Sequence, residues 1–550
     1  MLANLLRFLF AMPLDRLRLR RVQALIDSGI ARRQRGDLDG ALRDLERAVE
    51  LGPAIQESWI ELGNLLFARG ESRRAAECYG RALALAPGST VAKFNLGLAL
   101  REAGEISEAI AQFRRAYRDA PEMHGALRQL VTALIETDLC EKAHKVAAQA
   151  VESNPASYEA QLMLGFACFK LHEIGQALAC YEAAAKLRGD DAELFDCRAN
   201  ANQALGRLPE AIADFDRSLV LRPAFQRARF HRGLARLMLG DFENGWPDYE
   251  LRQISGDFEM GSRGFPRWDG TPLAGRTLLI KREQGLGDEI MFASILPEVT
   301  GAARHCVIEC DTRLRTLFSR SFPDATVYGS LPDRKLPHKL AGIGIDAEIG
   351  SGSLPLYLRR KLSDFPRHQG YLRADPERVA RWRERLAVLG TGPKLGISWA
   401  GGLRKTRREL RSIPLAQLLP ILRSPGLRFV SLQYTAGAAQ EVAELAVRQG
   451  LRVEHWPEAI EDYEETAALA CALDHIVSVC TSLVHLGGAL ARPIWVMAPH
   501  SPEWRYGFAG ESMPWYPTVR VFRQSAFGAW DDVIERVAAE LGRHFAPPGR

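Results

Sequence analysis

The sequence predicts two architectures in one chain, an α-solenoid followed by a doubly wound α/β region. The first observation is a 34-residue period that runs through the first half of the chain. Periods of about 20–50 residues are typical of solenoids. The second is the loss of this period around residues 261–275, after which apolar runs of four to seven residues alternate with helical stretches. Strands spaced by helices predict parallel sheets covered by helices.

Composition bounds the class of protein. At 550 residues the chain is too long for a single core, and about three or four domains are expected. Its 47% hydrophobic and 25% charged residues are typical of a soluble globular protein. The net charge is +5, of which +4 lies in residues 1–21. The remainder is nearly neutral, so we expect no nucleic-acid partner.

The nine cysteines predict neither a disulfide framework nor a zinc site. Their number is odd, they are scattered, and no CxxC pair occurs. The segment "CVIEC" at 306–310 is typical of a strand. We therefore expect no bound metal and a protein of the reducing cytoplasm.

Residues 1–21, "MLANLLRFLFAMPLDRLRLRR", form a basic amphipathic segment. No apolar run reaches the roughly 20 residues that cross a bilayer. A signal peptide would place its positive charges before the apolar core and would end in a small-residue cleavage site. Two interpretations stay open. The segment either lies on anionic lipid, as a peripheral contact at the inner face of the membrane, or packs on the first repeat, which we favour.

The period is clearest between residues 56–89 and 90–123. The whole array covers residues 22–255 in about seven units, and this pattern resembles the tetratricopeptide repeat. Small residues let the two helices of a unit approach closely, an aromatic side chain fills the gap, and proline ends the second helix. The positions in register are Gly63 with Gly97, Ala75 with Ala109, Tyr79 with Phe113, Ala82 with Ala116, and Pro87 with Pro121.

Repeats of this kind present a concave groove that usually binds a protein or peptide, so we expect such a partner. The pattern residues themselves are structural. The fourth unit has Val131 at the glycine position, and the sixth has Ala199 there, with Arg198 and Asn202 at usually apolar positions. These irregularities mark either a ligand face or tolerated drift, and we favour drift.

After a linker at 256–275, the chain reads as two α/β halves, 276–380 and 381–550, separated by a break near 370–393. Without strict alternation, the apolar runs fit parallel strands buried on both faces. In such sheets ligands bind at the carboxyl ends of the strands. The predicted strands are "TLLIK", "HCVIEC", "KLGISW", "RFVSLQY", "HIVSVC" and "PIWVMAP".

Four segments in order, "IKREQGLGDEIMFA", "GISWAGG…RSIPL", "EDYEETAAL" and "SVCTSLVHLGGALARPIWVMAPHSPEWRY", resemble glycosyltransferase family nine, the heptosyltransferase-like enzymes, in the variant fused behind tetratricopeptide repeats. The resemblance covers about 275 residues plus the repeats. It implies a GT-B fold with two Rossmann-like halves and an inverting transfer without metal or cofactor. A nucleotide sugar serves as co-substrate on the second half, and the acceptor lies on the first. In this fold the closing helix, "AWDDVIERVAAELGRHF", usually crosses back to the first half.

The loop "REQGLGDE" raises the question of why a carboxylate follows a glycine turn. An inverting reaction needs a general base beside the acceptor hydroxyl, and a carboxylate at a helix N-terminus is held by the dipole. The resemblance assigns that role to Asp288, with Gly287 beside the substrate. The alternative is that Asp288 only caps the helix.

The donor diphosphate is expected at "SVCTSLVHLGGAL". Thr481 and Ser482 place hydroxyls and free N–H groups at a helix start, which suits phosphate. His485, one turn later, matches the histidine of the resembling family, although a lone helical histidine is usually structural. At the position of Cys480, members of the resembling family usually have an Asp, and its loss puts the use of the nucleotide-sugar donor in doubt.

The basic run "GGLRKTRRELRS" follows another strand, and cations there can neutralise a leaving diphosphate. From this run we expect Gly401, Gly402, Lys405 and Arg411 in the site, although most such runs are solvated.

Two further candidates lie later in the chain. Asp462 either accepts a hydrogen bond from a ribose hydroxyl or caps a helix, and we favour the cap. The aromatic residues of the loop around Trp504, Trp515 and Tyr516 either stack on substrate or pack beneath the loop.

Three functions remain after these observations. We favour a glycosyltransferase whose repeats recruit a protein acceptor, a layout shared with O-linked N-acetylglucosamine transferases. A second keeps the chemistry with a lipid-linked glycan as acceptor. The third is a non-catalytic scaffold with a decayed transferase region, which Cys480 and the paired glycines favour.

Overall fold

The computed structural model describes residues 2–255, 262–330, 337, 340, 342–402 and 408–546. The chain divides into two compact units, Met1–Ala201 and Asn202–Arg550. The division falls within the repeat array rather than in the expected linker at 256–275. The physical reason is that the last helices of the array pack on the α/β region and belong to its unit.

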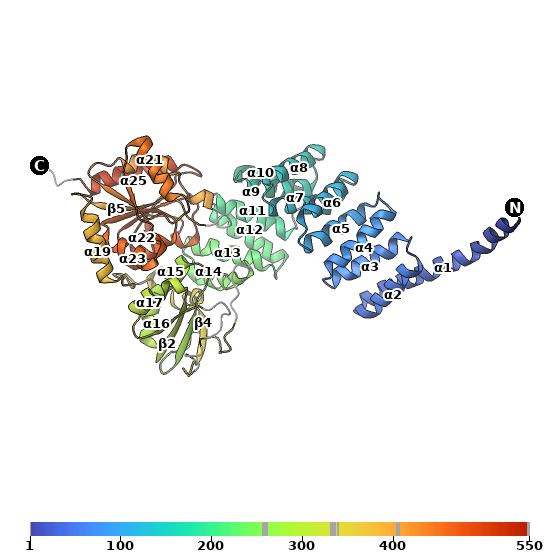
Figure 1. The fold of residues 1–550 in the computed structure, drawn as a ribbon, viewed down its shortest axis with the longest axis horizontal. Coiled ribbons are helices and arrows are strands. Elements are labelled where there is room, and N and C mark those ends of the chain that lie inside the picture. Colours follow the sequence, from blue (N-terminus) through green and yellow to red (C-terminus); the bar gives the residue numbers. More distant parts are fainter. Residues whose placement is uncertain are drawn as a thin grey trace. The chain divides into compact units, whose positions relative to one another are not determined.

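Seven helix pairs form the solenoid over residues 2–249 (blue to green in Figure 1). The predicted segment 1–21 is not a separate element, because α1 continues through it into the first repeat. No helix among the described residues is long and apolar enough to cross a membrane. The helices are α1 (Leu2–Gln34), α2 (Leu38–Leu51), α3 (Gln56–Ala68), α4 (Ser72–Leu85), α5 (Thr90–Glu102), α6 (Ile106–Asp119), α7 (His124–Glu136), α8 (Cys140–Ser153), α9 (Tyr158–Lys170), α10 (Ile174–Leu187), α11 (Ala192–Ala204), α12 (Leu208–Leu221), α13 (Gln226–Leu239) and α14 (Phe242–Tyr249).

Close helix approach explains the repeated glycines. A Cβ atom added at Gly63 would lie 2.7 Å from the Tyr79 ring, and one at Gly97 would lie 2.6 Å from the Phe113 ring. The fourth repeat reverses this arrangement, since buried Val131 replaces the glycine and buried Ala147 stands at the aromatic position. Exchanging the large and small residues conserves volume, so Val131 is core drift rather than a ligand face.

The turn between the two helices of each repeat also follows the 34-residue period. One residue of this turn has a positive φ in every repeat. Glycine occupies that position in five of the seven repeats, because it alone adopts this conformation without strain. Asp138 and His172 fill it in the other two. The series is Gly36, Gly70, Gly104, Asp138, His172, Gly206 and Gly240.

The first α/β half contains a four-stranded parallel sheet in the order β3-β2-β1-β4. Its strands β1 and β2 are the predicted runs, whereas β3 and β4, of four residues each, are too short to be recognised by pattern. The elements are β1 (Thr277–Lys281), α15 (Leu286–Phe292), α16 (Leu296–Ala302), β2 (His305–Cys310), α17 (Arg315–Ser321), β3 (Thr326–Gly329), β4 (Ala347–Gly350) and α18 (Pro355–Leu358).

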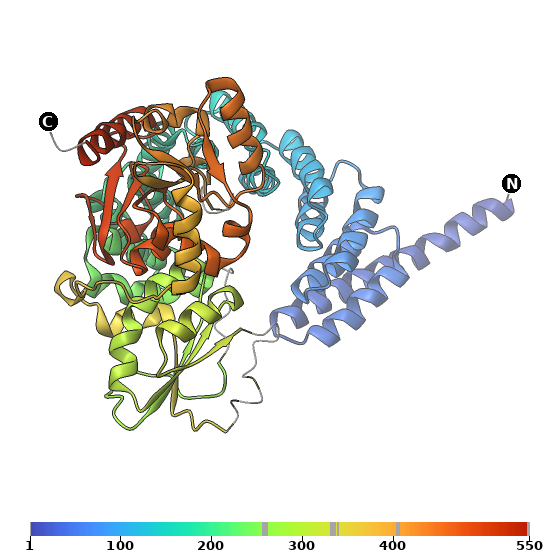
Figure 2. The same cartoon turned by 60° about the vertical axis from the view of Figure 1, so that its left-hand side comes forward.

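The second half contains a seven-stranded sheet in the order β10-β11-β9-β8-β5-β6-β7 (orange to red in Figure 2). Apart from the antiparallel edge strand β10, it is parallel and has the 3-2-1-4-5-6 order typical of dinucleotide-binding folds. The elements are α19 (Pro376–Ala387), β5 (Lys394–Ser398), α20 (Leu419–Leu422), β6 (Arg428–Ser431), α21 (Ala438–Gln449), β7 (Val453–His455), α22 (Glu458–Glu461), α23 (Tyr463–Ala472), β8 (His475–Val479), α24 (Ser482–Ala489), β9 (Ile494–Ala498), β10 (Ser512–Met513), β11 (Tyr516–Arg523) and α25 (Trp530–His544).

All six predicted runs form strands, and the α/β prediction is confirmed. The closing helix differs from expectation. Val533, Ile534 and Val537 of α25 are buried in the core of the second sheet. Because this apolar face is satisfied there, α25 stays on the second half instead of crossing back to the first.

An aromatic cluster joins α14 to both α/β halves. The Trp246 indole packs edge-on against Trp504 and donates a 2.7 Å hydrogen bond to the Arg359 carbonyl oxygen. Trp515 packs against Trp246 and Phe292. These loop aromatics, like Tyr516, are buried. They therefore pack beneath the loop, and the alternative of exposed stacking platforms is not observed.

Replacing Gly97 by alanine should destabilise the solenoid by about 1–3 kcal/mol, because the new methyl group overlaps the Phe113 ring. Gly80 on α4 is the matched control, since a Cβ there meets nothing within 4 Å. Gly80→Ala should be neutral or stabilise by up to about 1 kcal/mol. Urea unfolding measures both, and equal effects would contradict the close-approach argument.

His475 gives the second sheet a pH dependence. Its imidazole is buried between Trp495, His544 and Phe545. Burial, then His544 and Arg492, lowers its pKa from 6.5 to about 3. The folded pKa lies below the unfolded one, so the stabilisation is complete above pH 6.5 and decreases as the pH falls.

Between pH 6.5 and 5 this histidine should cost the wild type about 2 kcal/mol of unfolding free energy. His475→Phe should lack that loss. Denaturant unfolding at the two pH values measures it, and identical pH slopes for wild type and variant would show that His475 is not the cause.

Candidate functional site

The loop after β1 is held by the last repeat. Arg252, directly after α14, donates two hydrogen bonds of 2.8 and 2.9 Å to the Glu283 carboxylate and one of 2.7 Å to Ser353 Oγ. Both members of the Arg252–Glu283 pair are buried. Next along the loop, Gln284 has φ +60°, and its amide donates a 2.8 Å hydrogen bond to the Tyr249 hydroxyl. A strained loop conformation is thus fixed by residues of the solenoid.

Asp288 lies in the first turn of α15, whose N-cap is Gly285. Its carboxylate forms an ion pair with Arg505 from the second half. The helix-cap alternative for Asp288 is therefore not observed. The Arg505 side chain is only 16% exposed, and this partial burial opposes its charge, but Asp288 and Glu503 raise its pKa above the ordinary value.

Glu289, the neighbouring carboxylate, turns away from this pair. It is buried and accepts a 2.8 Å hydrogen bond from the Asp311 backbone N–H. Burial raises the pKa of Glu289 to about 8, although Arg282, 3.1 Å away, favours the charged form. Of the three acidic residues in the loop motif, Glu283 pairs with Arg252 and Glu289 is turned away, so Asp288 is the one that lines the cavity.

The loop after β8 places three of the predicted residues together. Thr481 is the N-cap of α24 and accepts a hydrogen bond from Leu483 N–H, and Ser482 begins the helix. His485, one turn later, is buried, and this lowers its pKa so that the ring is neutral. Its Nδ1 lies 3.1 Å from the Tyr516 hydroxyl. With Tyr516 donating to Nδ1, the proton of the ring is on Nε2.

Glycines allow these loops to approach one another. A Cβ at Gly287 would lie 3.0 Å from His485 Cδ2 and 3.4 Å from Ser482 Cα, so the first loop lies directly against the start of α24. A Cβ at Gly401 would overlap the Thr481 methyl group, and one at Gly402 would overlap the Arg411 guanidinium. Gly402 also has φ +86°.

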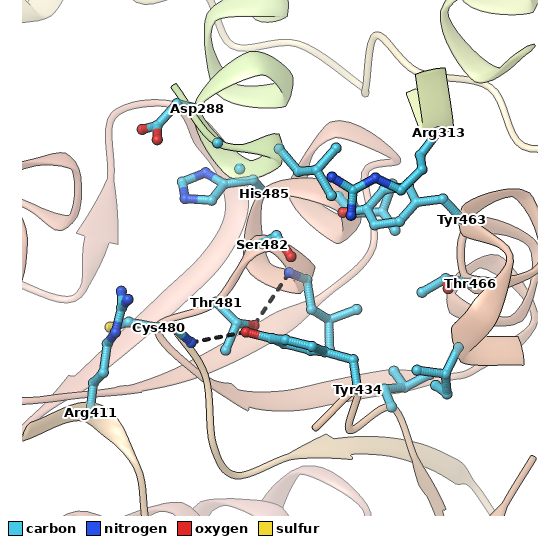
Figure 3. Close-up of a pocket in the computed structure, with 18 of the residues that line it drawn as sticks. Asp288, Arg313, Arg411, Tyr434, Tyr463, Thr466, Cys480, Thr481, Ser482 and His485 are labelled. Carbon is cyan, nitrogen blue, oxygen red and sulfur yellow. Dashed lines mark hydrogen bonds between the residues drawn. The ribbon is translucent and has the colours of Figure 1, made fainter. Parts of the chain in front are cut away.

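The loops enclose a cavity of about 630 Å³. Asp288 and His485 lie at one end, Thr481 and Ser482 in the middle, and Arg313 with Tyr463 at the other end (Figure 3). Because the strands of each sheet are parallel, the loops that follow β1, β5 and β8 all leave at carboxyl ends, where doubly wound folds bind ligands.

Cys480 lies in the cavity wall beside Arg411. Burial raises its pKa well above that of a free thiol, so it is neutral there. Arg411 instead pairs with Glu503. The carboxylate that accompanies this arginine thus comes from the loop after β9 and not from position 480.

The structure brings together most of the predicted site residues. Those lining the cavity are Gly287, Asp288, Gly402, Arg411, Thr481, Ser482 and His485. Gly401 lies behind Thr481. Asp462 is outside the cavity lining, since it caps α23 and pairs with Arg378 at 2.8 Å, as the favoured alternative predicts. Lys405 lies outside the described residues.

The prediction omitted several residues of the cavity wall. Arg505 had a signal, because it stands in the motif "SPEWRY", but its pairing with Asp288 spans 217 positions. Tyr434, whose hydroxyl accepts a 2.9 Å hydrogen bond from Gly402 N–H, lies just past β6, and Tyr506 ends the motif "SPEWRY". Tyr463 stands in the segment "EDYEETAAL" beside Asp462, whereas Arg313 carries no recognisable pattern.

The comparisons with known proteins support the repeats. The tetratricopeptide repeat family matches residues 26–71, 60–124, 128–192 and 198–252. Protein FlbA of Caulobacter vibrioides is 32% identical over 527 residues, 92% of this chain and 86% of FlbA. The peroxisomal targeting signal receptor of Candida albicans is 24% identical over 214 residues, 38% of this chain and 36% of the receptor. A tetratricopeptide repeat protein from Parabacteroides merdae is similar in structure, with TM-score 0.38 and 19% identity over 44% of this chain and 95% of that one.

Replacing Arg252 by methionine should lower stability by about 3–5 kcal/mol, because Glu283 is left buried without its partner. Arg267, which is 56% exposed and pairs with Glu250, is the control. Arg267→Ala should cost no more than about 1 kcal/mol. The double variant Arg252→Met with Glu283→Leu should be less destabilised than the single Arg252 variant. Denaturant unfolding tests the cycle, and additive losses would contradict a direct pair.

Proposed function

The chain belongs to the same family as protein FlbA of Caulobacter vibrioides, to which it is related over nearly its full length. From the residues that line its cavity, we propose that it is a glycosyltransferase acting on a protein acceptor. In this proposal the repeats hold the acceptor protein or peptide. The α/β unit, with a GT-B arrangement of its two halves, binds a nucleotide sugar and inverts the anomeric centre.

The observation that supports this proposal is that one cavity contains both a candidate base and a candidate site for a diphosphate. Asp288, a candidate base, enters from the first half, while the N-terminal end of α24 enters from the second with hydroxyls and a neutral imidazole. Free N–H groups at a helix start suit a diphosphate. The neutral Nε2–H of His485 is a further donor beside it.

The proposed reaction is a single displacement. Asp288 takes the proton of the acceptor hydroxyl, whose oxygen attacks the anomeric carbon as the bond from that carbon to the diphosphate oxygen breaks. The diphosphate leaves with the electron pair. Arg411 and Arg505 neutralise the charge that develops on it, together with the α24 N–H groups.

Arg505 has a second part in this proposal. While it is paired with Asp288, the carboxylate is engaged by the guanidinium. A bound diphosphate competes for the same guanidinium. Transfer of Arg505 from Asp288 to the diphosphate would release the base only when a donor is present.

The protein acceptor is proposed from the repeats. A match to a targeting signal receptor, a protein named for reading signals on other proteins, supports a protein or peptide in the groove. Charged side chains from the first helices of successive repeats also meet in the first unit. Arg128 of α7 bonds to Glu159 at 2.6 Å and pairs with Glu193 of α11.

A second candidate is a non-catalytic scaffold. Cys480 in place of a carboxylate, and an Asp288 engaged by Arg505, favour it. Glu503 beside Arg411 argues against decay at this position, because it supplies the carboxylate that Cys480 lacks.

Binding is measured first, as thermal unfolding with ADP, UDP, GDP and CMP and with their sugars. A ligand at about 100 times its Kd adds roughly 2.7 kcal/mol, a midpoint shift on the order of 5–10 °C. We expect one nucleotide to shift the midpoint, and Thr481→Ala with His485→Ala to abolish that shift. If none shifts it, the scaffold is the better account.

Catalysis is tested with Asp288→Asn. The variant should keep nucleotide binding but lose about 10²–10⁴ of the rate of nucleoside diphosphate release, because the base is absent. Asp462→Asn is the matched control, since asparagine caps a helix as well as aspartate. Unchanged turnover in Asp288→Asn would exclude it as the base, and mass spectrometry of the acceptor distinguishes a protein product from a glycan.

A further inference from the structure

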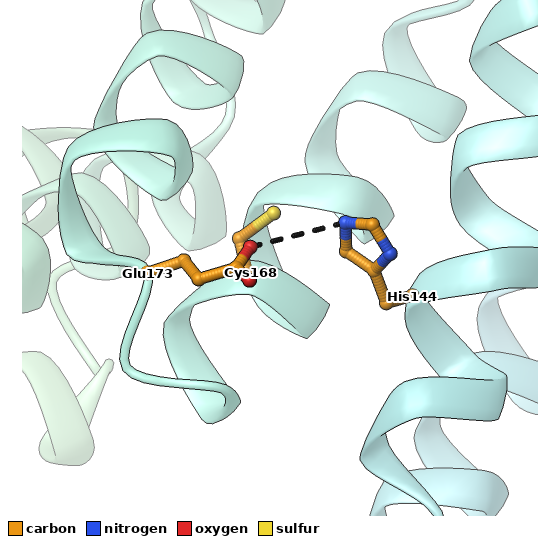
Figure 4. Close-up of side chains that lie close together, drawn as sticks. All are labelled: His144, Cys168 and Glu173. Atoms are coloured by element: carbon orange, nitrogen blue, oxygen red, sulfur yellow. Dashed lines mark ion pairs between the residues drawn. The ribbon is translucent and has the colours of Figure 1, made fainter.

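A group of metal-ligating side chains lies within the first unit, far along the chain from the cavity. His144 is on α8, Cys168 is near the end of α9, and Glu173 directly precedes α10 (Figure 4). One ligand atom from each, an imidazole nitrogen, a thiol sulfur and a carboxylate oxygen, lies within 4.8 Å of the others. Among the described residues, this is the group of three His, Cys, Asp or Glu side chains whose ligand atoms lie close enough together to hold a metal ion.

The contact between the imidazole and the carboxylate of the group is too long for a direct hydrogen bond. His144 Nε2 lies 3.9 Å from Glu173 Oε2, whereas a hydrogen bond between nitrogen and oxygen is about 2.7–3.2 Å long. Two ligands of a tetrahedral zinc ion, with metal–ligand distances of about 2.0–2.3 Å, lie roughly 3.3–3.7 Å apart. The ligand atoms, which lie within 4.8 Å of one another, would move together by up to about 1 Å to reach that spacing.

Cys180 on α10 lies beside Cys168 but outside the group of three. Cys168 is buried, whereas the His144 and Glu173 side chains are 33% and 42% exposed, so an ion can enter from solvent.

The ligand types select the metal. Calcium and magnesium take oxygen ligands, whereas a set with nitrogen and sulfur suits zinc and the similar cobalt ion. We propose that His144, Cys168 and Glu173 bind a divalent zinc-type ion that links the fourth repeat to the fifth. The CxxC spacing that normally signals such a site is absent because the ligands come from three helical segments.

The test uses the full-length reduced protein titrated with Co²⁺ and then with Zn²⁺. We expect one Co²⁺ per chain with a thiolate-to-cobalt charge-transfer band, displaced by Zn²⁺, and a rise in the unfolding midpoint on Zn²⁺ binding. Cys168→Ala should abolish the band, and His144→Gln should weaken binding by at least about tenfold. Cys78→Ala, which removes another buried thiol, and His124→Gln, which removes an exposed imidazole, should leave both unchanged.

The variant Glu173→Gln is included because Glu173 is at the surface, so this variant should fold even if Cys168→Ala does not. It too should weaken binding by at least about tenfold. Absence of the charge-transfer band in the wild type would overturn the proposal, as would equal affinities in wild type, Glu173→Gln and Cys168→Ala. Formation of a Cys168–Cys180 disulfide in air, with no metal uptake by the reduced protein, would assign the two thiols to redox chemistry instead.

Discussion

The buried ion pair between Arg252 and Glu283 is the constraint on which the second unit depends. It fastens the end of the repeat array to the loop that follows the first strand of the α/β region. Two charges without water are stable only when their remaining hydrogen-bonding groups are satisfied. Glu283 also accepts a hydrogen bond from Gly352 N–H, and Arg252 donates one to Ser353. The pair therefore holds the loop after β1 against the loop after β4.

That constraint determines the geometry of the cavity. With Glu283 and Gln284 held from one side, the chain enters α15 with Gly287 against His485 and Asp288 beside Arg505. The solenoid is therefore not simply attached to the α/β region, because its last helices hold the loop that presents the candidate base.

The cavity itself combines charges of both signs at short range. Asp288 and Glu503 each engage an arginine, and each of these arginines faces the space where a diphosphate is proposed. Ion pairs of this kind can be exchanged for a ligand with little change in net charge. His485 adds a donor that stays neutral, since burial keeps its pKa low. Neither Trp246 nor Trp504 of the aromatic cluster lines the cavity.

Features that depend on local spacing could be predicted from the sequence. The 34-residue period defined the helix pairs, since glycines such as Gly63 and Gly97 pack on an aromatic ring a fixed distance along the chain. Apolar runs located six strands, and Asp288 and Thr481 each follow the carboxyl end of one of them, in two different sheets. The pairing of Asp288 with Arg505 in place of a cap on α15, and the packing of α25 on the second sheet, became visible only in the folded structure. The fold also brought Cys168 beside His144. The partners in these contacts are far apart along the chain or on separate helices, and no periodic pattern records which of several charged or thiol groups will meet once the sheets and helices pack.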